Sequence, residues 1–362
     1  MLLKRKMKGE EGMQKILDTF NYCGMRYEVM EIGEGWKIVV SRHGGHVFGP
    51  FSEQYTDGLF WIPESVKNPA EYKKLIENQI WNTGGDRVWI APEIQFNIRD
   101  RYRFRETLDT PKTIDPGEFS MKRDGESIIL KQSLDLESYN TVTGKAHIEF
   151  ERTLLKALNP LRKLPDYDIL MKSVSYCGFE QVLDLTAESG QQIYAESWDL
   201  LQIRPRGCLY IPMYQAVRGT DHYEPAGDHE YLAGHGVALR ITGDSRYKIA
   251  YKSAVLTGRF GYLADEKNGE SYLIIINYPN NPSAMYSEEP PLREGDTGYS
   301  VHIYNDDGNS GGFAEMECNM QTVGRPTGLS RSVDRVAKWI YTGKRECLGR
   351  IADVLLGYSF EA

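Results

Sequence analysis

The chain has 362 residues, of which 41% are hydrophobic and 26% are charged, as is ordinary for a soluble globular protein. Its formal net charge of −8 argues against a nucleic-acid-binding surface and fits a neutral or polar small-molecule ligand. The 23 tyrosines and 35 glycines are typical of β-structure with tight turns and aromatic-lined clefts.

Cysteine use and hydropathy together predict a cytoplasmic protein. The five cysteines are scattered, odd in number and without a CxxC pair, which favours free thiols in a reducing compartment. No run of apolar residues reaches the length of a transmembrane helix, so we expect no membrane partner. From the negative net charge we expect no nucleic-acid partner. No GxGxxG, P-loop, GxSxG or HExxH motif is present, so we also expect no cofactor and none of the common hydrolase sites.

Two short helices are predicted in the first quarter of the chain. Residues 13–23 place apolar side chains at helical spacing, and Gly24 provides a C-terminal stop. We therefore expect residues 1–24 to form a helical extension ahead of a single domain over residues 25–362. The second helix is predicted over residues 68–79, where a proline lies near the start.

Between these two helices, residues 27–51 alternate apolar and polar side chains, which predicts strands interrupted by a glycine pair. His43 and His46 lie on either side of that pair. Their spacing could bring both onto a metal ion, but a site with two histidines needs further ligands. Hydrogen-bonded loop histidines are therefore the favoured interpretation.

Residues 83–93 combine a glycine pair with Asp86, Arg87, Trp89 and Glu93, and they show no helical period. Arg87 offers a planar fork of donors that suits vicinal hydroxyls or a carboxylate, and Asp86 can make charge-assisted hydrogen bonds. Trp89 provides a flat apolar face that can stack on a ring of a ligand. The alternative is a hairpin corner in which an Asp86–Arg87 bridge only fixes the loop.

From residue 94 to residue 214 the chain offers strand-length runs separated by turns. Strict alternation over residues 147–153 is the clearest of these runs, and loop-like residues 156–167 interrupt the series. Strands are predicted over residues 127–130, 131–137, 146–155, 198–203 and 208–212.

The segment from residue 220 to residue 235 is a polar insertion that holds three of the seven histidines and four carboxylates. His222, His229 and a carboxylate could hold a divalent metal, although their spacing matches no standard metal-binding geometry. The same side chains could serve as a general acid or as hydrogen-bond donors to a ligand. A solvated loop is the third interpretation.

Strands resume after this insertion, over residues 246–254, 258–263, 272–278 and 300–308. In residues 313–318, period two puts Glu315 and Glu317 on one face, while the Ala/Met/Cys face looks like core. Two carboxylates side by side raise each other's pKa, which is one way to obtain a general base near neutral pH. An outer, solvated face is the alternative.

The overall pattern predicts an antiparallel all-β fold, because strands are many, helices are few and βαβ alternation is absent. The assignment of residues 330–341 stays open. Their apolar spacing fits a helix, or a turn that leads into a strand over residues 339–341.

Several segments carry a resemblance to a known family. They read Gly-Gly-His-Val-Phe-Gly at residues 44–49, Gly-Gly-Asp-Arg-Val-Trp-Ile-Ala-Pro-Glu at residues 84–93, Val-His-Ile-Tyr-Asn-Asp-Asp at residues 301–307, and Gly-Gly-Phe-Ala-Glu-Met-Glu at residues 311–317. In this order they resemble the galactose mutarotase-like superfamily, and more narrowly the uncharacterised bacterial proteins grouped beside aldose 1-epimerases. The resemblance spans residues 25–358 and implies an antiparallel β-supersandwich whose concave face binds a mono- or oligosaccharide.

The resemblance also implies catalytic roles for individual residues. In aldose 1-epimerases the catalytic glutamate lies on a late strand after a glycine-rich loop, which matches Glu315, with Glu317 as a near alternative. Arg87 resembles the early arginine of the family and would orient the sugar ring. Trp89 and Trp198 would stack on that ring.

The family's two catalytic histidines, one of which lies in an Asn-His motif, have no clear match in this sequence. His222, His229, His43 or His46 would have to replace them, and we take His222 as the acid. The missing motif also favours a non-catalytic carbohydrate-binding protein as an alternative to an enzyme. Further substrate contacts are expected from Asp86, Trp89, Glu93, Trp198, His229, Asp306 and Glu317, without a metal.

Three activities are compatible with such a cleft. Mutarotation needs a base for the anomeric hydroxyl and an acid for the ring oxygen, so that the ring opens, rotates and recloses. A glycoside hydrolase would need two carboxylates, for which Glu93 and Glu315 are a candidate pair. A lyase acting on an acidic sugar would need cations such as Arg87, Arg204 and Arg206, although the negative charge of the chain disfavours an acidic sugar.

Overall fold

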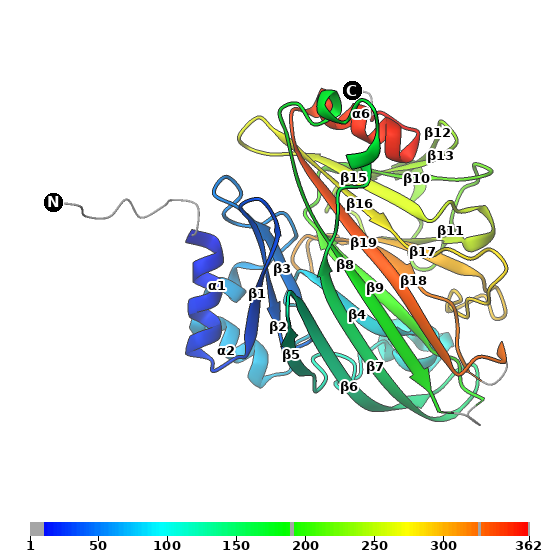
Figure 1. Ribbon diagram of the computed structural model, residues 1–362. Coiled ribbons are helices and arrows are strands. Elements are labelled where there is room, and N and C mark those ends of the chain that lie inside the picture. The colour runs from blue at the N-terminus through cyan, green and yellow to red at the C-terminus, as the bar shows by residue number, and fades with distance from the viewer. Residues whose placement is uncertain (1–10, 189–191, 325–326, 361–362) are drawn as a thin grey trace.

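The computed structural model describes residues 11–188, 192–324 and 327–360, and it consists mainly of two large antiparallel β-sheets that pack face to face (Figure 1). The longer helices lie at one side of the sandwich and over its outer surface. This architecture confirms the predicted antiparallel all-β sandwich with a short N-terminal helix.

The first sheet has nine strands, and its central strands carry the candidate site. Alternation along each strand gives every strand one face toward the second sheet and one face away from it. In spatial order the strands are β1 (Tyr27–Gly33), β2 (Trp36–Ser41), β3 (Val47–Phe51), β4 (Asp86–Ala91), β9 (Glu196–Ile203), β18 (Ala314–Asn319), β17 (Tyr299–Asn305), β14 (Tyr247–Lys252) and β11 (Thr220–Asp221).

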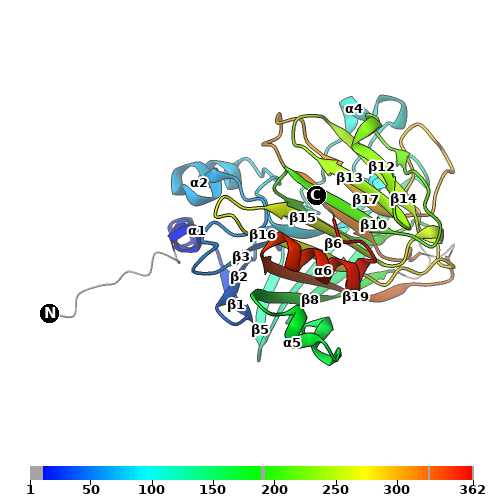
Figure 2. The ribbon, with the colours of Figure 1, turned by 90° about the horizontal axis from the view of Figure 1, so that it is seen from above.

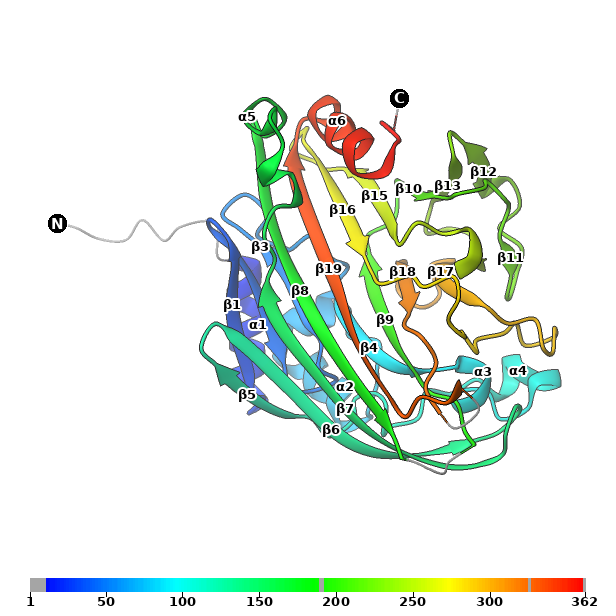
Figure 3. The same ribbon diagram turned by 45° about the vertical axis from the view of Figure 1, so that its right-hand side comes forward.

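The second sheet has ten strands and sweeps across the other side of the molecule (Figure 3). In spatial order they are β12 (Glu230–Ala233), β13 (Gly236–Ile241), β10 (Gly207–Pro212), β15 (Arg259–Asp265), β16 (Ser271–Asn277), β19 (Arg331–Gly343), β8 (Val174–Ala187), β7 (Gly144–Lys156), β6 (Ser127–Ser138) and β5 (Ser120–Asp124). Residues 127–137, predicted as two strands, form the single strand β6, which alternates buried and more exposed residues because only one face meets the core.

The predicted N-terminal helices are both present, as α1 (Glu11–Tyr22) and α2 (Pro69–Glu77), and they lie together beside β1, β2 and β3 (Figures 1 and 2). Ile16 and Phe20 of α1 are fully buried in an apolar cluster with residues of β2, β3 and α2. Asn68 caps α2 by accepting hydrogen bonds from the backbone N–H groups of residues 70 and 71, as its side chain favours at an N-cap.

The C-terminal helix α6 (Arg345–Leu356) covers the outer face of β15, β16 and β19 (Figure 2). The remaining helical segments are short. They are α3 (Glu93–Phe96), α4 (Phe104–Thr107), α5 (Tyr167–Leu170) and the 3₁₀ turns Glu64–Lys67, Arg101–Arg103, Pro160–Lys163, Gly227–His229 and Ser253–Val255.

Residues 331–343 form strand β19, so the helical interpretation of residues 330–341 is wrong. The strand pairs along its whole length with β8, and it also pairs with β16. Ser332 and Asp334 occupy buried positions while Val333 is exposed, which disturbs the alternation of apolar residues at the start of the strand. Tertiary pairing therefore decides the structure of a segment whose own pattern is ambiguous.

A cluster of two acidic and two basic side chains joins the two sheets inside the sandwich. Lys338 of β19 places Nζ 2.6 Å from Asp86 Oδ2 and 2.7 Å from Asp199 Oδ2, on the adjacent strands β4 and β9. Arg152 of β7 forms an ion pair with Asp86. All four side chains are at most 1% exposed, so each charge depends on the others for compensation.

This position of Asp86 corrects the prediction that it contacts a substrate. Successive residues of a strand point to opposite faces, so Asp86 enters the core while Arg87 faces away from it. The two side chains therefore form no bridge with each other, and Asp86 has no route to a ligand outside the core.

We predict that Lys338→Met lowers the free energy of unfolding by about 3–5 kcal/mol, because it leaves two buried carboxylates sharing one remaining cation. In the same strand, Arg331 pairs with Asp184 on the exposed face. The control Arg331→Met should cost less than about 1 kcal/mol. Urea denaturation of both variants tests this difference, and equal losses of stability would contradict the role assigned to the buried cluster.

Candidate functional site

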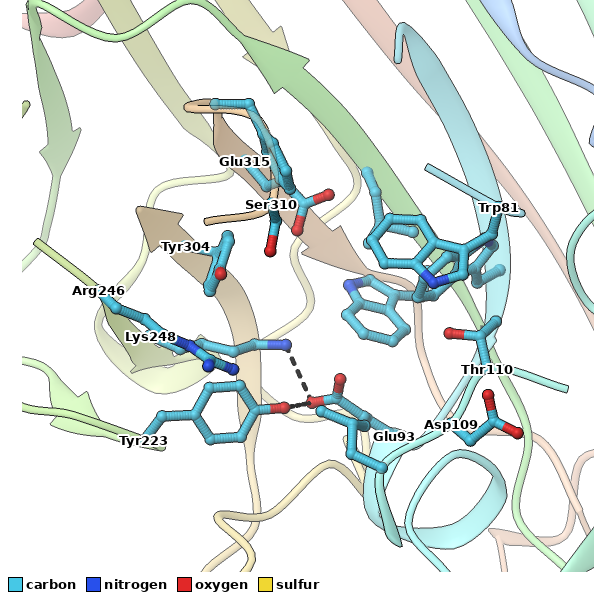
Figure 4. Close-up of a pocket in the computed structure, with 15 residues that line it drawn as sticks. Trp81, Glu93, Asp109, Thr110, Tyr223, Arg246, Lys248, Tyr304, Ser310 and Glu315 are labelled. Carbon is cyan, nitrogen blue, oxygen red and sulfur yellow. Dashed lines mark hydrogen bonds and ion pairs between the residues drawn. The ribbon is translucent and has the colours of Figure 1, made fainter. Parts of the chain in front are cut away.

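A pocket of about 210 Å³ is hollowed into the face of the nine-stranded sheet that points away from the core (Figure 4). The side chains that form it come from the central strands and from the loops around them. They are Trp81, Trp89, Glu93, Leu108, Asp109, Thr110, Trp198, Leu200, Tyr223, Arg246, Lys248, Tyr304, Ser310, Phe313 and Glu315.

Three tryptophans form one wall of the pocket. The rings of Trp81 and Trp89 meet edge to face at 5.2 Å, and those of Trp89 and Trp198 do so at 5.5 Å. The Arg87 guanidinium lies 4.6 Å from the centre of the Trp89 ring, so the wall is backed by a cation. Such a wall offers flat apolar surface to the C–H face of a ring, and the stacking expected of Trp89 and Trp198 stays a prediction.

Glu315 lines the pocket, and Arg87 lies fully buried behind it, in contact with Glu315 and Trp89. The predicted direct contact of Arg87 with a sugar ring is therefore not supported by this geometry. Glu315 Oε1 accepts hydrogen bonds from Arg87 Nη2 at 2.8 Å and from Gln202 Nε2 at 3.1 Å. Among the described residues no donor binds Glu315 Oε2, and the carboxylate lines the pocket. Gln202 lies directly opposite Glu315 on the neighbouring strand, so the sheet register itself aligns this pair.

Behind Arg87 lies Asp115, which carried no signal in the sequence. Its Oδ2 accepts a hydrogen bond from Trp89 Nε1 at 2.9 Å, contacts His46 Nε2 at 3.2 Å and lies 3.7 Å from Arg87 Nε. His46 Nδ1 contacts the Gly84 carbonyl oxygen at 2.7 Å, so His46 is the hydrogen-bonded loop histidine favoured above. Asp115 thereby positions both the ring wall and the arginine that holds Glu315.

Glu93 occupies the opposite side of the pocket from Glu315 (Figure 4). Its Oε2 accepts hydrogen bonds from Tyr223 Oη at 2.6 Å and from Lys248 Nζ at 3.0 Å. Burial lowers the pKa of Lys248, but the negative charge that Glu317 carries once it ionises and the carboxylate of Glu93 outweigh that effect, and the net pKa is raised. Lys248 is therefore an ammonium ion, and neither it nor Tyr223 was singled out from the sequence.

Glu317 lies behind the pocket and does not line it. Its side chain is fully buried, Oε2 accepts a hydrogen bond from Trp198 Nε1 at 2.9 Å, and Lys248 Nζ is 3.5 Å away. Burial, helped by the nearby Glu315 and Glu93, raises the pKa of Glu317 to about 8, although Lys248 and Trp198 act in the opposite direction. Burial outweighs the single ammonium of Lys248, so Glu317 carries a proton at neutral pH.

The polar insertion contributes Tyr223 to the pocket but not its histidines. His222 is buried and faces the ring of Tyr299, and burial together with the charge of Lys248 holds its pKa well below the usual range. His229 contacts Ser245 Oγ through Nε2 at 3.0 Å. Neither histidine lines the pocket, so the predictions of His222 as the acid and of His229 as a substrate contact are not supported by this geometry.

Asp306 shapes the pocket from outside rather than lining it. Its Oδ2 accepts hydrogen bonds from the backbone N–H groups of Gly308, Ser310 and Gly312, at 3.0, 3.1 and 2.9 Å. These bonds hold the glycine-rich loop that places Ser310 and Phe313 on the pocket wall. The side chain of Asp306 is fully buried, so the predicted direct contact with a ligand is replaced by a structural role.

Two general features complete the description of residues 11–188, 192–324 and 327–360. Within these ranges no group of three His, Cys, Asp or Glu residues is arranged to hold a metal ion. None of their helices has the length and apolar character needed to cross a membrane.

Comparison with known proteins identifies the fold. No family profile matches the sequence, and no curated protein shows significant sequence similarity. A candidate aldose 1-epimerase from Escherichia coli K12 is structurally similar, with a TM-score of 0.50 at 13% identity over 88% of this chain and 99% of that one. A galactose mutarotase-related enzyme from Lactobacillus acidophilus has a TM-score of 0.46 at 11% identity, over 88% of this chain and 97% of its own. The chain thus has the galactose mutarotase-like fold.

We predict that the stability of the protein depends on the proton of Glu317. Its pKa is raised from 4.5 to about 8, so the folded state binds this proton more tightly than the unfolded state. The resulting stabilisation is complete below the unfolded pKa and is lost as the pH rises through about 8.

The Glu317→Gln variant cannot titrate at this position. The free energy of unfolding of the variant should therefore increase relative to that of the wild type as the pH rises from about 5 to 8. The upper limit of this relative increase is about 1.4 kcal/mol per pH unit. Urea titrations at a series of pH values measure this difference. Parallel pH profiles for the two proteins would show that Glu317 is ionised in the folded state.

Proposed function

We propose that the pocket binds a sugar ring and that the protein interconverts its anomers by acid–base chemistry of the aldose 1-epimerase type. One observation carries this proposal. Glu315 and Glu93 lie on opposite sides of a tryptophan-walled pocket, and protein donors hold one oxygen of each carboxylate while no described residue binds the other. A ring stacked on the wall would lie between the two carboxylates.

Glu315 is the base in this proposal. Its free Oε2 would accept the proton of the anomeric hydroxyl, while Arg87 and Gln202 keep the carboxylate in place through Oε1. As that proton leaves, the bond between the anomeric carbon and the ring oxygen breaks and a carbonyl forms. Rotation about the adjacent C–C bond and reclosure then give the other anomer, with the proton returned from Glu315.

Lys248 is the donor that replaces the family's histidine in this proposal. The ring oxygen gains a proton when the ring opens, and the Lys248 ammonium lines the pocket within reach of a bound ring. While the ring is open, the protonated carboxyl of Glu317, 3.5 Å from Lys248 Nζ, can pass its proton to Lys248. On reclosure the ring hydroxyl gives its proton back to Lys248, and Lys248 returns one to Glu317. The missing Asn-His motif and the buried His222 fit an acid of another residue type.

A glycoside hydrolase is the second candidate, and the facing pair of carboxylates favours it. Glu93 and Glu315 would act as acid and base or nucleophile on the two sides of a glycosidic bond. Release of the phenol from aryl glycosides distinguishes this activity from anomer exchange, which leaves glycosides intact.

We predict that the wild type accelerates anomer exchange of freshly dissolved α-glucose, α-galactose, α-xylose or α-glucuronate, followed by NMR. The Glu315→Gln variant should lose about 10²- to 10⁴-fold of that rate, because the amide cannot accept the proton. Glu149→Gln, on the outer face of the other sheet, is the matched control and should keep the full rate. Undiminished exchange in Glu315→Gln would remove this residue from the base role.

We also predict that the rate of exchange falls as the pH rises through about 8, where Glu317 loses the proton that resupplies Lys248. In Glu317→Gln the rate of exchange should be lower, and the fall in rate at about pH 8 should disappear from the pH–rate profile. If the rate still falls near pH 8 in the variant, a group other than Glu317 causes that decrease.

A further inference from the structure

The two glutamates that line the pocket are each paired with a cation, whereas two further lining charges, Arg246 and Asp109, are not part of these pairs. Glu315 is paired with Arg87 at 2.8 Å, and Glu93 is paired with Lys248 at 3.0 Å. The guanidinium of Arg246 donates no hydrogen bond to any described residue, and its ion pair with Glu224 Oε2 spans 3.9 Å. A cation with free donors therefore lines the pocket.

Glu224 does not neutralise Arg246, because it is already engaged. Its Oε1 accepts a hydrogen bond from Arg105, so two arginines share one carboxylate. One positive charge of this group of three stays uncompensated. The side chain of Arg246 is 45% exposed, so it is also accessible to a ligand that enters from solvent.

Arg246 points into the pocket beside Lys248, two residues further along the chain (Figure 4). Asp109 lies on the other side of the pocket, is exposed and lines it as well. Arg246 would attract an anionic group of a ligand, whereas Asp109 would repel it. The electrostatic potential therefore differs between the two sides of the pocket, and the side at Arg246 is the one that favours an anionic group.

We infer that the sugar bound in this pocket carries an acidic group, a carboxylate or a phosphate, and that Arg246 binds it. This inference rests on the proposed sugar-binding function and names its substrate class. A guanidinium has donors only, arranged as a planar fork that matches the oxygens of a carboxylate or phosphate in pairs. The ring would stack on the tryptophan wall, with its anomeric hydroxyl at Glu315 and its acidic group at Arg246.

The overall charge of −8 does not oppose this assignment, although it disfavoured an acidic ligand when only the sequence was considered. Exposed charges beyond about 10 Å are largely screened at ordinary ionic strength. The charges nearest the anion are those of the pocket, where the two lining glutamates are paired with Arg87 and Lys248 and Asp109 lies on the side away from Arg246.

The test measures binding by the change in tryptophan fluorescence, since three of the six tryptophans form the pocket wall. Glucuronate and galacturonate carry the carboxylate, glucose 6-phosphate carries the phosphate, and glucose and galactose are the neutral references. Each sugar is titrated into the wild type, Arg246→Gln, Arg246→Lys and the control Arg331→Gln on the outer face. Anomer exchange of the same sugars is followed in parallel.

We expect one acidic class to bind the wild type more tightly than the neutral sugars and to weaken as salt is added. Arg246→Gln should weaken binding of that class on the order of tenfold or more, with little change for neutral sugars. Arg246→Lys should restore part of the loss, and Arg331→Gln should behave as the wild type. Whether the uronates or the phosphate respond identifies the acidic group.

Equal binding of neutral and acidic sugars would overturn the inference, as would a loss in Arg246→Gln that is the same for both. Failure of every acidic sugar to bind would also overturn it. The outcome is separable from the proposed function, because binding is measured without turnover. Arg246-dependent binding without anomer exchange would support the acidic ligand and contradict the proposed catalysis. Anomer exchange of neutral sugars alone would support the proposed catalysis and contradict the acidic ligand.

Discussion

The geometry of the cleft depends on the ion cluster buried between the two sheets. Lys338 of one sheet is held by Asp86 and Asp199, which lie on adjacent strands of the other. Sliding either strand by one residue would turn its carboxylate out of the core and leave the lysine charge uncompensated, at a cost of several kcal/mol. With β4 fixed in this register, its next residue, Arg87, faces the cleft.

On the other face of the same strands, the carboxylates of the pocket are also held by buried cations. Each carboxylate that could do chemistry is held by a cation that is itself buried, Arg87 for Glu315 and Lys248 for Glu93. Asp115 in turn fixes Arg87 and the neighbouring Trp89 from behind. Side chains constrained in this way are oriented before a ligand arrives.

The sequence reveals those parts of the site that local pattern encodes. Alternation over residues 313–318 is enough to separate the carboxylates of β18 from its core face, and the all-β fold follows from many such runs. It cannot reveal Lys248, Tyr223 or Asp115, because their partners lie far away along the chain and only the folded sheet brings them together.

The residues whose predicted roles the structure does not support also show that contacts between distant parts of the chain cannot be read from local sequence. Asp86 was assigned to the ligand because its carboxylate can make charge-assisted hydrogen bonds. The sequence could not show that it is buried, because the compensating Lys338 lies about 250 residues later in the chain. The histidines of the polar insertion attracted attention by their density. Density along the chain says nothing about direction, and His222 packs against Tyr299 instead of the pocket.

Alternation also restricts how such a protein can diverge. Core-facing and cleft-facing residues share the same strands, so a one-residue insertion in β18 would bring Met316 into the cleft and bury a glutamate in the core. Length changes in the central strands are therefore selected against, whatever the ligand. The segments free to vary in length are the loops at the rim, which carry Asp109, Tyr223 and Ser310. Proteins that descend from this chain would acquire new ligands chiefly through changes in the length and sequence of those loops. The strands beneath the pocket would change only by substitution of single residues.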